Sequence, residues 1–183
     1  HTHVAVKEFF PNGYAYRESS DLSVKAMPGQ QDFYLSVLDK FLEEARLLAK
    51  FKHPNIVRIN RYLEANGTAY LVMDYEEGQT LEEYLNSLDR PLKEDECKQV
   101  IVPVLEGLNE LHKKSILHRD VKPDNIYIRS NGQPLLLDFG AARQLLQQAE
   151  SSMTVIVSKG YAAPEQYLGK YDELGPWTDI YGI

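Results

Sequence analysis

The chain has 183 residues, 43% of them hydrophobic and 26% charged, which is enough for one sizeable domain with a hydrophobic core. Its formal net charge of −7 argues against a nucleic-acid partner held mainly by phosphate neutralisation. No apolar run approaches the roughly 20 residues that span a bilayer, and the single cysteine, Cys97, excludes an intrachain disulfide and fits a reducing compartment.

The first predicted elements are a strand and a helix separated by a loop. Residues 4–10 are rich in β-branched and aromatic side chains and end at Pro11, which is typical of a strand. The polar residues 14–31 are expected to form a long loop. Between residues 33 and 51 apolar side chains recur every three to four positions, which predicts an amphipathic helix.

Two strands and a short helix are predicted next. Residues 56–63 and 68–74 have the composition of strands, and the Asn-Gly pair between them favours a hairpin. Residues 81–88 are predicted to form a helix that Thr80 caps, with acidic side chains in its first turn.

The rest of the chain is predicted to be mainly helical. Residues 92–113 indicate a longer helix, with a kink expected at Pro103 because proline lacks the amide hydrogen of the helix ladder. Short strands are predicted at residues 126–129 and 134–137, joined by a turn that contains an Asn-Gly pair.

The run of residues 118–125, His-Arg-Asp-Val-Lys-Pro-Asp-Asn, carries the densest chemistry and is followed thirteen residues later by Asp138-Phe139-Gly140. It places Asp120 as a candidate base, and Asn125 and Asp138 as candidate Mg²⁺ ligands. A base and hard oxygen ligands are what the transfer of a phosphoryl group from ATP to a hydroxyl requires.

The pattern H-R-D-x-K-x-x-N followed by D-F-G resembles the catalytic loop and metal-binding motif of protein kinases, and Lys122 resembles the Ser/Thr branch rather than the Tyr branch. The resemblance to bacterial-type Ser/Thr kinases runs over nearly the whole chain. The resemblance implies an α+β bilobal fold, with a small antiparallel sheet and one helix in the first lobe and a mainly helical second lobe. Residues 1–76 would be a partial N-terminal lobe and residues 77–183 a partial C-terminal lobe. It also implies transfer of the ATP γ-phosphoryl to a Ser or Thr hydroxyl of a protein, with Mg²⁺ as cofactor.

The run Val-Ala-Val-Lys at residues 4–7 resembles a strand of the small lobe of these kinases. The resemblance implies that Lys7 pairs with the α- and β-phosphates of ATP and that an acidic residue on the next helix holds it. Glu44 is the candidate, because it shares the apolar face of that helix. Glu43 is the rival, and it projects about 100° away, toward the polar side.

Further roles in nucleotide binding follow only from position in the family. The backbone of Asp74 and Glu76 would hydrogen-bond the adenine, and Ala5 and Tyr127 would sandwich its two faces.

In the catalytic loop the resemblance implies that Asp120 is the base and that Lys122 neutralises the γ-phosphoryl. Asn125 and Asp138 would hold Mg²⁺. His118 is expected to be a packed core histidine, Ser158 to bridge Asp120 and Lys122, and Asp179 to cap the backbone of the catalytic turn.

Arg119 precedes the catalytic Asp, which in this family makes activity depend on a phosphorylated activation segment. The candidate phosphorylation sites, including autophosphorylation sites, are Ser151, Ser152 and Thr154. An unmodified loop is the alternative.

The chain departs from the family pattern at both ends, because the glycine-rich loop and the later large-lobe helices are absent. We therefore expect a truncated kinase domain that is inactive on its own and prone to aggregate. A pseudokinase or regulatory binding module is the alternative function, and an aminoglycoside-type small-molecule kinase is a third. The Ala163-Pro164-Glu165 motif and Tyr161 favour a protein substrate. We expect a cytoplasmic location, with any membrane anchor outside this chain.

Overall fold

The computed structural model describes residues 3–138 and 160–183, and these residues divide into two compact units. The first unit comprises residues 3–51 and 58–75, and the second comprises residues 52–57, 76–138 and 160–183. No helix among these described residues is both long and apolar enough to cross a membrane.

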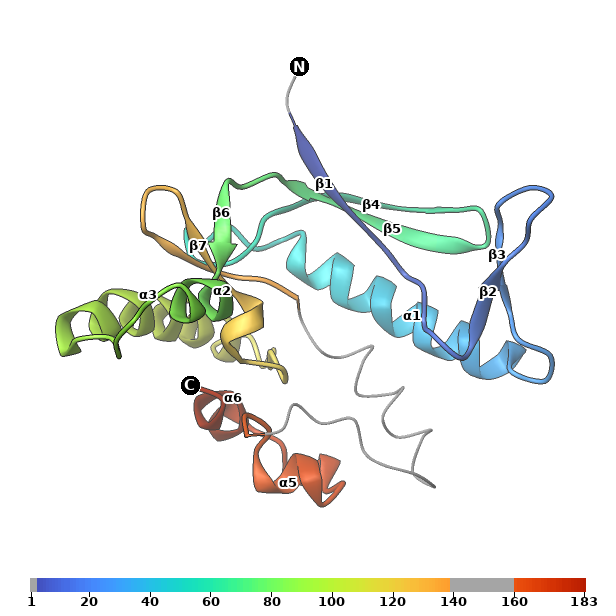
Figure 1. Cartoon of the computed structure of the whole chain (residues 1–183). Helices are drawn as coiled ribbons and strands as arrows, with labels where there is room; N and C mark the ends of the chain where they lie inside the picture. The colour runs from blue at the N-terminus through green and yellow to red at the C-terminus, as the bar shows by residue number, and fades with distance from the viewer. Residues whose placement is uncertain (1–2, 139–159) are drawn as a thin grey trace. The chain divides into compact units, whose positions relative to one another are not determined.

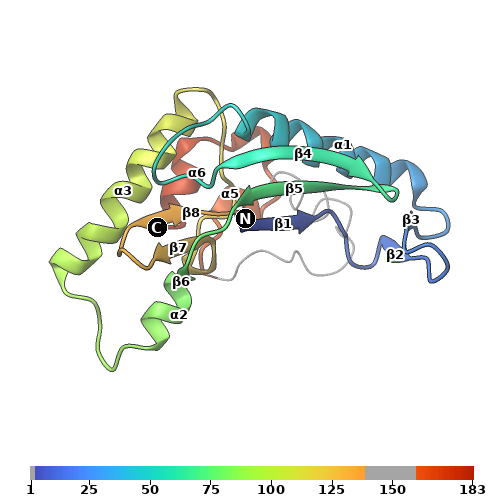
Figure 2. The same ribbon diagram turned by 90° about the horizontal axis from the view of Figure 1, so that it is seen from above.

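The first unit is built on an antiparallel sheet of three strands in the order β1-β5-β4 (Figure 2). The strands are β1 (Val4–Glu8), β4 (Ile59–Ala65) and β5 (Thr68–Asp74). The predicted hairpin between β4 and β5 is confirmed. Asn66 and Gly67 both have positive φ, 53° and 71°, which is the backbone that a two-residue turn between twisted strands requires.

The prediction that residues 14–31 form a loop is wrong in part. The strands β2 (Ala15–Arg17) and β3 (Val24–Ala26) pair there as a small antiparallel ribbon. The ribbon is anchored to the β4–β5 turn, because the backbone N–H of Val24 donates to the carbonyl of Asn66 at 2.7 Å. Three-residue strands carry too few apolar positions to show the alternation by which a strand is recognised in sequence.

Helix α1 (Gln31–Leu48) confirms the predicted amphipathic helix and lies along one face of the three-stranded sheet (Figure 1). Its apolar stripe is buried, and it consists of Tyr34, Val37, Leu38, Phe41, Leu42, Ala45 and Leu48. The ring of Phe9 packs against Tyr34 and Phe41, with centroid distances of 5.5 and 5.2 Å. Burial of each such large side chain stabilises the fold by about 1.5–3 kcal/mol.

The second unit contains a sheet in the order β6-β7-β8. The strands β7 (Ile126–Arg129) and β8 (Pro134–Leu136) confirm the predictions, whereas β6 (Gly78–Thr80) was not predicted because its three residues include no apolar side chain. Helix α2 (Leu81–Asn86) follows β6 directly. Thr80 caps it as predicted: its hydroxyl accepts from the N–H of Glu83 at 3.1 Å, and the Glu83 carboxylate accepts from the N–H of Thr80 at 2.8 Å.

Helix α3 (Glu94–His112) is the longest element of the second unit and continues as one helix across Pro103, where a kink stays a prediction. It buries Val104, Leu108 and Leu111. The shorter helical elements η1, α5, η2 and α6 follow, and they span Pro123–Asn125, Pro164–Tyr167, Tyr171–Glu173 and Pro176–Tyr181.

His118 is a fully buried member of this core, as predicted. Its Nε2 donates to the carbonyl of Leu137 at 2.7 Å, and its Nδ1 accepts from the N–H of Asp120 at 3.4 Å, so the neutral imidazole uses both nitrogens. Burial lowers the pKa of His118 below its usual value, although the nearby carboxylates of Asp179, Asp120 and Asp138 act in the opposite direction.

We therefore predict that the protein loses stability as the pH falls below the usual histidine pKa of 6.5. The unfolded chain takes up a proton at His118 before the folded chain does, so the contribution of His118 is complete above that pH and decreases below it, by up to about 1.4 kcal/mol per pH unit. Urea unfolding at several pH values would measure this slope. The slope should become shallower in His118→Phe, and an identical slope in both proteins would contradict the assignment.

Candidate active site

The turn between α3 and β7 is held by a carboxylate from α6. Oδ2 of Asp179 accepts from the backbone N–H of His118 at 2.8 Å, and Oδ1 accepts from the N–H of Arg119 at 2.6 Å. Nε2 of His112, at the end of α3, donates to Oδ2 at 2.7 Å. Asp179 is only 1% exposed, so these three donors compensate for the desolvation of its carboxylate.

Arg119 adopts a backbone conformation that is rare outside glycine, with φ of 67°. Such a conformation costs about 1–3 kcal/mol and persists only where the surroundings enforce it. The N–H of Arg119 donates to Asp179, and its carbonyl accepts from Nε2 of Gln166 at 2.8 Å. Side chains from α6 and α5 thus fix both the backbone N–H and the backbone carbonyl of Arg119.

Helix α6 approaches the turn closely at Gly182. A Cβ atom at this position would lie 2.3 Å from the carbonyl oxygen of Val121, which is far inside van der Waals contact. The backbone of Gly182 is helical, so the glycine is required by space and not by its φ angle.

The structure brings Asp120, Lys122 and Asn125 together. Nδ2 of Asn125 donates both to the backbone carbonyl of Asp120 at 2.7 Å and to its Oδ2 at 2.8 Å. Nζ of Lys122 lies 3.8 Å from Oδ2 of Asp120 and 3.7 Å from Oδ2 of Asp124. The tight η1 turn closes this arrangement, because the N–H of Asn125 donates to the carbonyl of Lys122 at 3.0 Å. The Asp120 carboxylate is therefore oriented by an amide and lies beside a cation.

The oxygen donors fit a hard divalent cation. The Asn125 amide uses its nitrogen on Asp120, which leaves Oδ1 as the atom that would contact a metal. Asp138 is exposed, and its neighbour Leu137 donates its N–H to the carbonyl of Asn125 at 2.9 Å, which ties the two candidate ligands to one frame. No cluster of three or more His, Cys, Asp or Glu suited to a metal occurs in residues 3–138 and 160–183. Mg²⁺ in proteins is usually held by one or two side-chain oxygens together with phosphate oxygens and water.

Two of the residues expected near adenine meet in the second unit. The Tyr127 hydroxyl donates to the backbone carbonyl of Glu76 at 3.3 Å, and the Glu76 carboxylate pairs with Nε of Arg129 at 3.1 Å. Glu76 is thereby held where the chain re-enters this unit, and Tyr127 lies directly against it.

The other expected nucleotide-binding residues lie in the first unit. Ala5 and Lys7 are alternate residues of β1, pair with Met73 and Leu71 of β5, and are both half-buried, whereas Val4 and Val6 are exposed. Ala5 and Lys7 therefore share one face of the sheet. Asp74, at the end of β5, accepts from Nδ2 of Asn60 at 2.7 Å.

The rival acids on α1 differ in their surroundings. Glu43 is exposed and pairs with Nζ of Lys40 at 2.7 Å, whereas Glu44 is half-buried. This difference agrees with the choice of Glu44, and its pairing with Lys7 stays a prediction.

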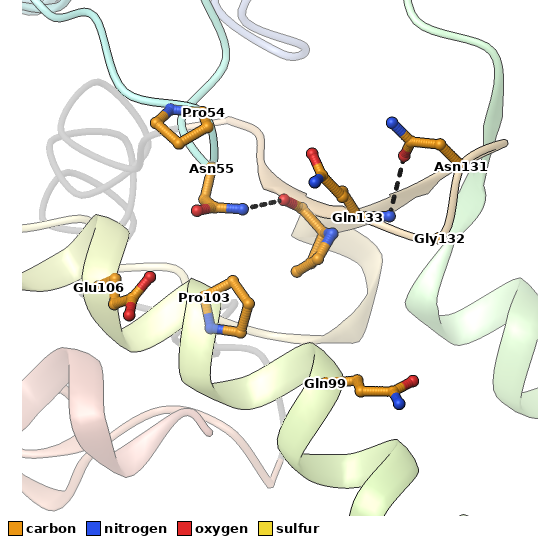
Figure 3. A pocket seen from close by; sticks show the side chains of 9 residues that line it. Pro54, Asn55, Gln99, Pro103, Glu106, Asn131, Gly132 and Gln133 are labelled. Carbon is orange, nitrogen blue, oxygen red and sulfur yellow. Dashed lines mark hydrogen bonds between the residues drawn. The ribbon is translucent and has the colours of Figure 1, made fainter.

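The pocket drawn in Figure 3, of about 440 Å³, lies within the second unit. Its lining comprises Pro54, Asn55, Gln99, Pro103, Glu106, Asn131, Gly132, Gln133 and Pro134. Nδ2 of Asn55 donates to the carbonyl of Pro134 at 2.8 Å and so joins the segment before β4 to β8 (Figure 3). None of the predicted site residues lines this pocket.

Two contacts of the site were not predicted from the sequence. Gln166 was not singled out, and its signal in the sequence was only its place directly after Ala163-Pro164-Glu165. Glu165 itself accepts from the Thr178 hydroxyl at 2.5 Å. Phe139, Ser158 and the candidate phosphorylation sites Ser151, Ser152 and Thr154 lie outside the described residues.

Comparisons with known proteins agree with this geometry. The protein kinase domain family matches residues 14–183. The probable serine/threonine-protein kinase PknB of Lactococcus lactis is 35% identical over 145 residues, covering 79% of this chain and 23% of that protein. The probable serine/threonine-protein kinase MRK1 homolog of Encephalitozoon cuniculi is 35% identical over 179 residues, covering 91% of this chain and 54% of that protein.

A solved structure described as the apo form of PpkA-294 superposes with a TM-score of 0.85 at 35% identity, over 98% of this chain and 62% of that one. The chain thus spans from about a quarter to about half of the length of these curated relatives. The expected α+β kinase fold and the resemblance to Ser/Thr kinases are confirmed, and the chain belongs to the protein kinase family.

Proposed function

We propose that the protein is an ATP-dependent protein serine/threonine kinase and that this chain carries its base, the groups that orient the base, and its metal-binding residues. The observation that supports this most directly is the Asn125 amide, which bridges the carbonyl and the carboxylate of Asp120. A carboxylate held in this way presents a fixed oxygen to an incoming hydroxyl.

The reaction breaks the bond between the γ-phosphorus of ATP and its bridging oxygen and forms a bond to the Ser or Thr oxygen. Asp120 orients the substrate hydroxyl and takes its proton. Lys122, close to Asp120, places its ammonium where it would neutralise charge on the phosphoryl group as it transfers. Mg²⁺, when bound by Asn125 and Asp138, would neutralise the phosphate oxygens of ATP.

We assign the nucleotide-binding roles that the family pattern gives. Lys7 would pair with the α- and β-phosphates and be held by Glu44. Ala5 and Tyr127 would contact the two faces of adenine, and the backbone of Asp74 and of Glu76 would hydrogen-bond its edge. The shared, half-buried face of Ala5 and Lys7 on β1 supports this assignment.

The substrate we propose is a protein, because the family and the named relatives are protein kinases. Ser151, Ser152 and Thr154 are the proposed autophosphorylation sites, and the cytoplasm is the proposed location.

We predict that Asp120→Asn lowers phosphoryl transfer by about 10²–10⁴-fold while leaving ATP affinity within about twofold of wild type, since an amide keeps the shape but cannot take the proton. Radiolabelled transfer and isothermal titration with ATP, on the complete gene product, would measure the two effects. Asp172→Asn, an exposed carboxylate of η2, is the matched control. Transfer near the wild-type rate would refute the role of Asp120, and a wild type that binds ATP without any transfer would support the pseudokinase alternative.

We further predict that Asp138→Asn raises the Mg²⁺ concentration for half-maximal transfer by about tenfold or more, because a neutral amide is a weaker ligand for a hard cation. ATP binding without metal should change little. Titration of transfer rate against Mg²⁺, with Glu173→Gln as an exposed control, would measure this. An unchanged Mg²⁺ dependence would exclude Asp138 as a ligand.

A further inference from the structure

Gln166 makes two hydrogen bonds with opposite ends of one carboxamide. Its Oε1 accepts from the backbone N–H of Ala163 at 3.0 Å, and its Nε2 donates to the carbonyl of Arg119 at 2.8 Å. The first bond caps the short helix α5, and the second reaches 47 positions back along the chain to the catalytic turn. Only a side chain that both accepts and donates can make this pair of bonds.

The carbonyl that Gln166 holds belongs to the peptide group joining Arg119 to Asp120. A rotation of that peptide group changes ψ of Arg119 and φ of Asp120, and unless other torsions compensate it turns the Asp120 side chain to a new direction. Arg119 has a strained, positive φ of 67°. The turn would therefore lower its free energy by changing conformation if its anchors were removed. Asp179 holds the N–H of Arg119, and Gln166 holds its carbonyl.

The anchors on the two sides are themselves linked. Glu165, the neighbour of Gln166, accepts from the hydroxyl of Thr178 at 2.5 Å, and Thr178 is the neighbour of Asp179. The Thr178 hydroxyl also accepts from the N–H of Gly175 at 3.1 Å, so it is fixed at the start of α6. The pairs Glu165-Gln166 and Thr178-Asp179, linked to each other, therefore hold the Arg119 backbone from both sides.

We propose that Gln166 is a positioning residue for phosphoryl transfer. Through the Arg119 carbonyl it sets the direction of the Asp120 carboxylate. Through the Ala163 N–H it sets the segment that contains Tyr161, which would receive the protein substrate. One side chain would thus hold both the base and the segment that contains Tyr161. This inference rests on the proposed kinase function.

The variant Gln166→Glu separates the two bonds. The carboxylate has the same shape and still accepts from Ala163, but it cannot donate to the Arg119 carbonyl and repels it. We expect kcat to fall about 10–100-fold, the range in which small displacements of a catalytic group reduce rates, with KM for ATP unchanged. Protonated Glu regains a donor, so the ratio of variant to wild-type kcat should rise as the pH falls from about 8 to about 5. Gln166→Ala should lose activity without this pH rescue.

Hydrogen exchange provides a readout that needs no activity. The peptide covering residues 118–122 should exchange faster in Gln166→Glu and Gln166→Ala than in wild type. Gln133→Glu, the same substitution on the exposed turn between β7 and β8, should match wild type in exchange and in kcat. Wild-type exchange in the turn of Gln166→Glu, or a wild-type kcat without pH rescue, would overturn the inference. A wild-type protein that transfers no phosphate would instead overturn the proposed function, and the exchange data would still decide whether Gln166 holds the turn.

Discussion

The carboxylate of Asp179 lies in the interior of the second unit with almost no access to water, and it accepts hydrogen bonds there from N–H groups of His118, Arg119 and His112. Such a group is costly unless each lone pair finds a donor, and the donors here come from the end of α3 and from the turn that follows it. The conformation of residues 118–120 is therefore the one that satisfies Asp179. His118 completes the arrangement from the other side, because its imidazole links the N–H of Asp120 to the carbonyl that precedes Asp138.

This dependence explains why a buried histidine and a buried aspartate stand so close to a site that handles protons and phosphate. Neither side chain needs to take part in the reaction. Each buried side chain fixes the position of backbone groups by hydrogen bonds. The backbone in turn sets the positions of Asp120, Asn125 and Asp138. A polar interior of this kind is stable only when complete, so loss of one member costs more than its own hydrogen bond.

The elements that the sequence predicts best are those determined by residues close together in the chain. Helix α1, the β4–β5 hairpin and the Thr80 cap follow from local periodicity and turn chemistry, and they are present as predicted. The ribbon β2–β3 and strand β6 escape such reasoning, because their short strands are formed by tertiary contacts and not by propensity.

The same distinction between local and long-range contacts applies to the candidate site. Asp120, Lys122 and Asn125 lie within six positions, so their proximity could be anticipated from spacing. The role of Asp179 came only from resemblance to a family, and Gln166 was missed entirely. Hydrogen bonds that span 47 to 61 positions depend on how α5 and α6 fold back on the turn, and no local pattern records this.

The absence of a side chain at Gly182 has a consequence for mutations outside the catalytic loop. The missing side chain at the end of α6 is what allows the helix to approach Val121 closely enough for Asp179 to reach the turn. A mutation there would touch neither nucleotide nor substrate, yet it would push on the residue beside the base. Gly182→Ala would therefore displace the backbone next to the base although it changes no residue of the catalytic loop.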